Sequence, residues 1–298
     1  MLADCGRSRP PIGAPGAIPQ SSALIQHAAN GKSWMLPEAK KNTLLYVSSP
    51  GRNLVNIFTY PGGRLVGSLT GIPYPYGLCS DKRGDVFVVS WSSESGPGSI
   101  IEYAHAASQP TVTLTDGDYT PAQCSVDPNT GNLAAGNLNF NIAVWANAQG
   151  SPTYYSTLGF IEENWTITYD ANGDLYFASL RYRKGQAWLP QGSSGVARFD
   201  VPKNGLYRYG QYLTIRAKAK SGATVARYAL SGSRGSKIGY MKINDCYGLR
   251  EYAIKGSTLV AACSSSVAFF KYPAGGNPTN TISGLDDPYG VAISLASR

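Results

Sequence analysis

The side chains most able to do chemistry in this chain of 298 residues are a small set of oxygen donors. They are Glu162, Asn164, Asp245 and Asp287, which stand in the connections between short apolar runs. Carboxylate and amide oxygens are the ligands that calcium prefers, and a metal held in this way can polarise a carbonyl group. One interpretation is therefore a calcium site. The other is that Asp and Asn stabilise turns by bonding to their own backbone, so that no cofactor is firmly indicated.

Histidine is nearly absent, since only His27 and His105 occur. This excludes most of the common catalytic and zinc sites that are built on histidine. A serine or cysteine nucleophile would need a neighbouring base, and we expect neither histidine to have a suitable partner. The sequence therefore favours a protein without catalytic activity. The alternative is a metal-dependent hydrolase or lactonase that uses the four oxygen donors.

The basic residues are concentrated in one part of the chain. Residues 178–255, which we call the basic sector, contain 15 Lys and Arg but only three Asp and Glu, whereas the whole chain has a net charge of +8. Arg181, Arg183, Arg216 and Lys218 are expected to form one anion-binding cluster there. Such a cluster would attract an acidic polysaccharide, a cell-surface polymer or another protein, while nucleic acid is not favoured. The other interpretation is that these charges keep the protein soluble.

A repeat of about 43 residues positions these side chains. A turn that begins with an apolar, usually aromatic, residue starts at residues 60, 103, 145, 189, 228 and 272. A second marker, an Asp followed by a Gly turn and an apolar run, starts at Asp81, Asp127 and Asp170. Each repeat contains four short apolar runs, which is typical of the four strands of a β-propeller blade. Six turns predict six blades.

The second repeat shows how the strands of a blade should be arranged. Its four strands are expected at residues 76–80, 85–90, 99–103 and 111–114, from the innermost to the outermost. Residues 86–89 are apolar in succession, as a strand requires when both faces of its sheet are covered. The sequence at 75–80 is copied at 288–294, so the carboxyl-terminal strand should complete the first blade and protect its edge. The sequence thus predicts an all-β fold, with residues 44–298 forming a six-bladed β-propeller of four-stranded blades.

The run PYGLCSDKRGDVFVVS, at residues 75–90, resembles the NHL-type six-bladed propellers. The resemblance covers residues 44–294 and implies the architecture, but this fold supports many activities. In such propellers, function usually lies on the face where the loops that enter the innermost strands meet the loops that leave the second strands. The resemblance therefore implies a ligand on this face, with Tyr74, Trp91 and Tyr119 as its aromatic contacts.

Residues 1–43 are expected to form a tail or linker rich in Gly and Pro. Its start, Leu2 to Cys5, is similar to a bacterial lipobox, although Asp4 replaces the usual small residue. With the YPGG turns, this start resembles that of secreted bacterial propeller lipoproteins of unassigned function. Cys5 is then a candidate for lipidation, which would be the only association with a membrane. No signal segment stands before Cys5, so export would need a start further upstream, and an accidental cysteine is the alternative.

The other four cysteines suit an oxidising compartment, although four buried thiols would look the same in the sequence. Cys246 and Cys263 should face each other across a hairpin, so they are the expected disulfide. Cys79 and Cys124 occupy equivalent positions in adjacent blades. Together with the lipobox-like start, the cysteines predict a protein that is secreted or anchored outside the cytoplasm.

Overall fold

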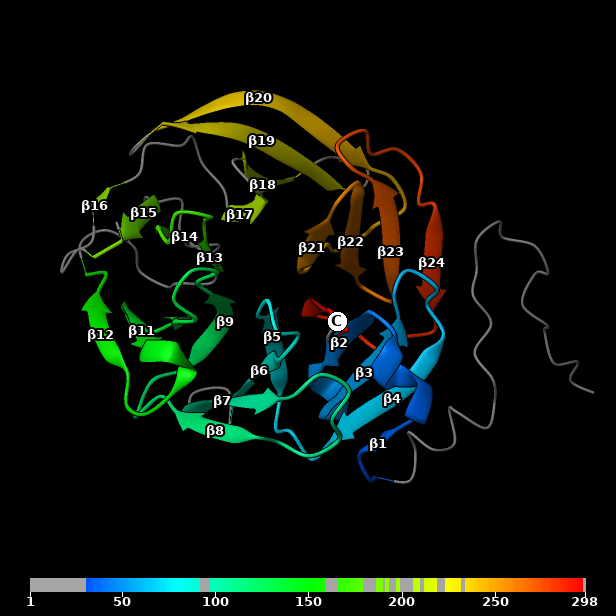
Figure 1. Cartoon of the computed structure of the whole chain (residues 1–298). Coiled ribbons are helices and arrows are strands. Elements are labelled where there is room, and N and C mark those ends of the chain that lie inside the picture. Colours follow the sequence, from blue (N-terminus) through cyan, green and yellow to red (C-terminus); the bar gives the residue numbers. More distant parts are fainter. Residues whose placement is uncertain are drawn as a thin grey trace, which may run out of the picture.

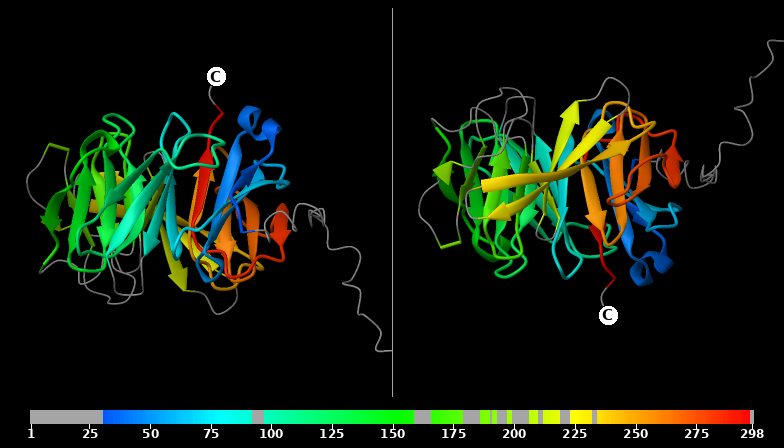
Figure 2. Two further views of the ribbon diagram at one scale, coloured as in Figure 1. Left: turned by 90° about the horizontal axis from the view of Figure 1, so that it is seen from below. Right: turned by 90° about the horizontal axis from the view of Figure 1, so that it is seen from above.

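The computed structural model describes residues 31–91, 97–158, 166–178, 186–189, 191–192, 197–198, 206–209, 212–218, 223–231 and 234–296. Within them, β-strands are joined by turns and by three short 3-10 helices, η1 (Pro37–Lys41), η2 (Pro50–Arg52) and η3 (Ala146–Ala148). The strands form six sheets arranged in a ring around a central axis (Figure 1). Side views show that the ring is wider than it is thick (Figure 2). The fold is a β-propeller, and the all-β prediction is confirmed.

The first sheet joins the two ends of the described chain. Its strands lie in the order β1 (Trp34–Met35), β4 (Leu65–Thr70), β3 (Leu54–Thr59), β2 (Leu44–Ser49) and β25 (Val291–Ser294). Strand β25 pairs antiparallel with β2, so that Leu44 lies opposite Ser294 and Val47 lies opposite Val291. The carboxyl-terminal strand therefore completes the first sheet, as the copied sequence predicts.

Strand β1 adds a fifth, outermost strand to this sheet. Trp34 lies opposite Ser68, and Met35 lies opposite Gly67. A Cβ atom at position 67 would come within 2.5 Å of the Met35 sulfur, so glycine lets the side chain lie across the strand. The sheet thus begins before the expected boundary at residue 44, because a strand of two residues leaves no periodic pattern in the sequence.

Each remaining sheet has four antiparallel strands, which follow the chain from the axis to the rim. The second sheet contains β5 (Pro75–Ser80), β6 (Val86–Trp91), β7 (Gly98–Tyr103) and β8 (Val112–Thr115). The third contains β9 (Pro121–Val126), β10 (Leu133–Asn137), β11 (Asn141–Trp145) and β12 (Thr153–Ser156). The fourth contains β13 (Thr166–Tyr169), β14 (Leu175–Ala178), β15 (Gln186–Leu189) and β16 (Ala197–Arg198). The fifth contains β17 (Leu206–Tyr209), β18 (Tyr212–Lys218), β19 (Ala223–Ser231) and β20 (Arg234–Ile243). The sixth contains β21 (Tyr252–Lys255), β22 (Thr258–Cys263), β23 (Ser266–Lys271) and β24 (Asn280–Ser283).

The repeated Asp-Gly marker builds the turn between the first and second strands of a sheet. Oδ1 of Asp81 accepts hydrogen bonds from the backbone N–H groups of Arg83 and Asp85, both at 2.9 Å. Asp127 and Asp170 accept backbone hydrogen bonds in the same way, at 2.7–2.9 Å. The glycine of each turn has a positive φ, of 94° at Gly84, 75° at Gly131 and 85° at Gly173. Only glycine adopts such angles without a steric cost, which explains why both residues recur together.

Strand β6 shows how neighbouring sheets pack. All six of its residues are buried. Val86 and Val88 belong to an apolar cluster shared with the first sheet, while Phe87 and Val89 belong to a cluster shared with the third. The apolar run therefore fills two interfaces at once, which confirms the prediction for a strand covered on both faces.

Close packing of the innermost strands brings the loops of neighbouring sheets together at the axis. A Cβ atom at Gly290 would come within 2.4 Å of the Tyr76 carbonyl oxygen. Ser48 bridges the same junction, since its hydroxyl donates to the Tyr76 carbonyl at 2.6 Å and accepts from the Gly290 N–H at 2.7 Å. These contacts hold the first and second sheets in register where the ring closes.

Candidate binding face

Because every sheet has the same antiparallel order, the loops divide between two faces of the ring. We call loop face the face that carries the connections into the innermost strands and out of the second strands. Its described connections are residues 50–53, 71–74, 97, 116–120, 138–140, 157–158, 244–251, 264–265 and 284–290. The opposite face, which we call the turn face, carries the Asp-Gly turns and the connections between third and fourth strands.

An aromatic cluster lies at the axial side of the loop face. The Tyr76 ring stacks on Trp91 with a centroid distance of 3.7 Å and meets the edge of Tyr289 at 4.6 Å. The Arg250 guanidinium lies over the Tyr289 ring, 5.8 Å from its centroid, and donates to Asp287 at 3.1 Å. Aromatic rings next to an arginine are typical of the centres of protein interfaces.

Exposed apolar side chains gather on the same face. Among the described residues, eight large apolar side chains are exposed, and five of them belong to the loop face or reach it from β12. These five are Tyr74, Phe140, Tyr154, Leu158 and Tyr247. Leu158 is 71% exposed and Tyr247 is 68% exposed, so they can contact a partner without rearrangement. Exposed apolar residues that cluster on one face mark interaction sites more often than isolated ones do.

The backbone of the loop face is also unusual. Tyr74 has a φ of 39°, Phe140 of 61°, Asp245 of 57° and Asp287 of 42°. A positive φ is a steric cost for a residue with a side chain, and most of all for a bulky ring. Ala106, Asn147 and Ala148 on the turn face also have a positive φ, so the loop face differs in carrying large rings, Tyr74 and Phe140, at such positions.

A buried carboxyl group lies beneath this surface. Asp116 is fully buried, and neither of its carboxylate oxygens has a hydrogen-bond partner of ordinary geometry among the described residues. Burial raises the pKa of Asp116 to about 7, although the nearby Asn137 and Tyr154 side chains act in the opposite direction. Nothing in the sequence distinguishes Asp116 from the Asp residues of turns, so sequence reasoning missed it.

A second buried carboxyl group, Glu251, joins several sheets at the axis. It is 4% exposed and lies next to the Gln123 side chain of β9 and the backbone N–H groups of Val291 and Leu78. Burial raises the pKa of Glu251 well above its usual range, while these donors act in the opposite direction. This role cannot be seen in the sequence, because the partners come from three other sheets.

The predicted metal ligands are only partly described. Glu162 and Asn164 lie outside the described residues. Asp245 is exposed, and Asp287 pairs with Arg250 at 3.1 Å. Within the described part of the chain, no three His, Cys, Asp or Glu side chains are grouped in a way that could hold a metal ion. Calcium therefore stays an expectation from the sequence.

The predicted anion-binding cluster is also largely outside the described part. Arg181 and Arg183 lie outside it, and for Arg216 and Lys218 the structure describes only the backbone of β18, in which Lys218 is the last residue. Acidic and basic residues are separated along the chain more sharply than the composition of the basic sector alone shows. Residues 84–180 contain ten Asp and Glu and no Lys or Arg, whereas residues 201–244 contain nine Lys and Arg and no Asp or Glu.

The three predicted aromatic contacts have different environments. Tyr74 is 40% exposed, and Tyr119 is half-buried with its ring 4.8 Å from that of Tyr154. Trp91 is only 4% exposed, because it packs against Tyr76 and donates from Nε1 to the Pro121 carbonyl. Trp91 therefore supports the loop face from below. Its burial disagrees with the prediction that it contacts a ligand.

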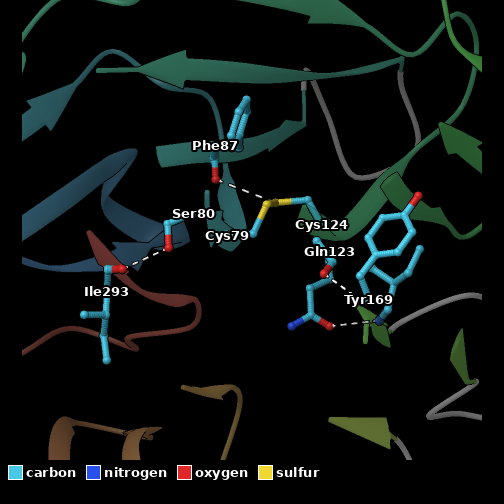
Figure 3. The surroundings of a disulfide bond; sticks show 9 residues. Cys79, Ser80, Phe87, Gln123, Cys124, Tyr169 and Ile293 are labelled. Carbon is cyan, nitrogen blue, oxygen red and sulfur yellow. Dashed lines mark hydrogen bonds between the residues drawn. A yellow bond between two sulfur atoms is a disulfide. The ribbon is translucent and has the colours of Figure 1, made fainter. Parts of the chain in front are cut away.

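Two disulfides are present. Cys246 and Cys263, the pair expected from the sequence, have Cα atoms 5.2 Å apart and join the connection that enters β21 to the end of β22. Cys79 and Cys124 form a second bond, with Cα atoms 5.6 Å apart, which joins the innermost strands of the second and third sheets (Figure 3). Cys5 lies outside the described residues. Disulfides persist in oxidising environments, so the two bonds point to a location outside the cytoplasm.

His105 has a partner that the sequence analysis did not foresee. Its Nδ1 lies 2.6 Å from the Ser294 hydroxyl of β25. Burial lowers the pKa of His105, and nearby backbone carbonyls of residues 39–42 act in the opposite direction. Ser294 is fully buried, so this pair fastens the closing strand and has no access to a substrate.

Comparisons with known proteins identify the fold but no family. No family model matches the chain, and no curated protein matches it. A chain in the crystal structure of a nidogen/laminin complex is similar, with a TM-score of 0.67 and 14% identity over 86% of this chain and 100% of that chain. A functionally unknown protein from Desulfotomaculum acetoxidans has a TM-score of 0.56 and 11% identity over 85% of this chain and 99% of its own. At these identities the likeness shows the fold alone. No helix among the described residues is long and apolar enough to span a membrane.

Proposed function

We propose that this chain is a six-bladed, NHL-type propeller that works outside the cytoplasm as a binding or scaffold protein without catalytic activity. Its partner is a macromolecule that docks on the loop face. The observation that carries the proposal is the set of exposed Tyr74, Phe140 and Tyr247 side chains, presented by loops around one axis. Two of these residues, Tyr74 and Phe140, also have a positive φ, so their side chains are held in place by a constrained backbone.

The comparison supports the same proposal in one respect. The similar propeller in the nidogen/laminin structure is part of a complex between two proteins. A protein is therefore the first partner to test for this chain. An acidic polysaccharide or cell-surface polymer is the second, because the basic sector would attract a partner with negative charge.

Site-specific photo-crosslinking in the cells that produce the protein tests the docking face. A crosslinking amino acid replaces Tyr247 in one variant and Phe140 in another. Tyr240, which is also exposed but lies on the rim strand β20, provides the matched control. We expect adducts from positions 247 and 140 and none from position 240. Adducts from position 240 alone would show that the loop face is not the docking face.

Charge reversal tests the anionic component separately. The Arg216→Glu and Lys218→Glu double variant changes the net charge by the same amount as a Lys40→Glu and Lys41→Glu control outside the basic sector. We expect retention on a heparin column to fall for the first variant only, and wild-type retention to fall steeply with salt. Equal losses in both variants would mean that net charge alone causes retention.

A further inference from the structure

The ring axis contains a cavity that opens away from the loop face. Its volume is about 480 Å³, and the walls that the structure describes come from β5, β9, β13, β21 and β25. Drug-sized and sugar-sized ligands occupy pockets of about 300–1,000 Å³, so the cavity has room for one small molecule. Asp81, Lys82, Lys255 and Leu295, at the carboxyl ends of the innermost strands, place its mouth on the turn face.

The floor of the cavity is polar and buried. Gln123 and Glu251, which are 7% and 4% exposed, line it. Gln123 Oε1 accepts a hydrogen bond from the Ile167 N–H at 3.3 Å, so the amide is held in place. Because burial favours the neutral form of Glu251, the floor does not repel an anion that enters the cavity.

Hydroxyl groups project from the walls beside the second disulfide. The Ser80 hydroxyl donates to the Ile293 carbonyl at 2.9 Å and keeps its acceptor capacity (Figure 3). The Ser125 hydroxyl accepts from the Tyr169 N–H at 2.9 Å and keeps its proton for a ligand. The apolar Leu78 and Ala253 also line the cavity, so its walls match a molecule that carries both hydroxyl groups and carbon faces.

Two ammonium groups stand at the mouth. Lys82 is exposed and donates to the Pro128 carbonyl at 3.1 Å, whereas Lys255 is half-buried. Among the described residues, Lys255 has no ion-pair partner, and burial lowers its pKa. Among the described residues that line the mouth, Asp81 is the only carboxylate, and it is already paired with Arg83 at 2.8 Å. The mouth therefore has an excess of positive charge that an anionic group on a ligand would neutralise.

We propose that this axial cavity binds a small polyhydroxylated anion, such as a sugar acid or a sugar phosphate. The anionic group lies between Lys82 and Lys255, and the hydroxyl groups bond to Ser80, Ser125 and Gln123. This site lies on the opposite face from the proposed docking face, so either can exist without the other.

Isothermal titration calorimetry of the full chain tests the site with three probes: glucuronate, glucose 6-phosphate and neutral glucose. We expect saturable binding of at least one anion, and glucose to bind at least about ten-fold more weakly. The Lys82→Ala and Lys255→Ala double variant should weaken the anion at least about ten-fold, since it removes both cations. A carboxylate or a phosphate preference then identifies which anion the site takes.

Lys271→Ala is the matched control, because Lys271 is exposed at the turn-face end of β23 and does not line the cavity. We expect it to leave the affinity unchanged. Thermal melts should show that all variants fold, since none of the three lysines is buried. The proposal is wrong if neither anion binds saturably up to about 10 mM, or if Lys271→Ala weakens binding as much as the double variant.

Discussion

Removing the two disulfides separately should have different consequences for stability, because they close loops of different length. The changes are Cys79→Ala with Cys124→Ala in one variant, and Cys246→Ala with Cys263→Ala in the other. Cys79 and Cys124 are 45 residues apart in sequence, whereas Cys246 and Cys263 are 17 apart. The first bond joins two sheets, whereas the second joins a loop of the sixth sheet to its second strand.

The expected magnitudes follow from the chain entropy that each bond removes from the unfolded state. A closed loop of 15 residues contributes about 3 kcal/mol and one of 100 residues about 4.7 kcal/mol, so the first bond should contribute about 4 kcal/mol and the second about 3 kcal/mol. For a domain of 150–250 residues, about 4 kcal/mol corresponds to a fall in melting temperature of roughly 8–16 °C.

Urea denaturation and calorimetry without reductant measure these losses. The wild-type protein under reducing conditions is the control, because it keeps the buried sulfur atoms and loses only the bonds. We expect the reduced wild-type protein to be about as stable as a variant in which all four of these cysteines are replaced by alanine. A loss below about 1 kcal/mol for the first pair, or a larger loss for the second pair than for the first, would show that loop length does not set the contribution of these bonds.

Three further predictions concern closure and the two buried carboxyl groups. Deleting residues 288–298 removes β25 and exposes the edge of β2, so the protein should aggregate on size-exclusion chromatography; a truncated protein that melts like the full chain would contradict this. Asp116 has a pKa raised to about 7, so its contribution to stability is present at low pH and is lost as the pH rises through 7. Relative to Asp116→Asn, the wild type should lose up to about 4 kcal/mol of unfolding free energy between pH 4 and pH 8, and parallel pH profiles would show that Asp116 is not buried as described. Glu251→Ala leaves the Gln123 amide and two backbone N–H groups without their acceptor, so it should cost about 3 kcal/mol or more in urea denaturation, whereas a cost below about 1 kcal/mol would exclude this role.

The fold could be predicted because its signals are local. Asp81, Asp127 and Asp170 each bond to backbone groups within four residues, so the same turn needs the same sequence each time it occurs. The copied sequence at 75–80 and 288–294 indicated closure, since equivalent strands of a repeat carry equivalent residues.

The site could be predicted only as a face, because its details depend on contacts between sheets. Trp91 was expected to meet a ligand, but stacking on Tyr76 turns it into the interior. The hydrogen-bond partners of Glu251 and His105 lie on other sheets. Ser294, the partner of His105, is 189 residues away in sequence. Periodicity within one segment carries no information about such contacts.

Crosslinking identifies a partner, which can then be purified. Hydrogen–deuterium exchange of the protein with and without this purified partner tests directly whether the loop face binds a macromolecule. We expect slower exchange on binding in peptides that cover residues 71–75, 138–141 and 244–251, which contain loop-face connections. Peptides that cover the turn-face connections at 104–111 and 146–152 should exchange at an unchanged rate. Protection confined to the turn face or to the rim strand β20 would show that the loop face does not bind the partner.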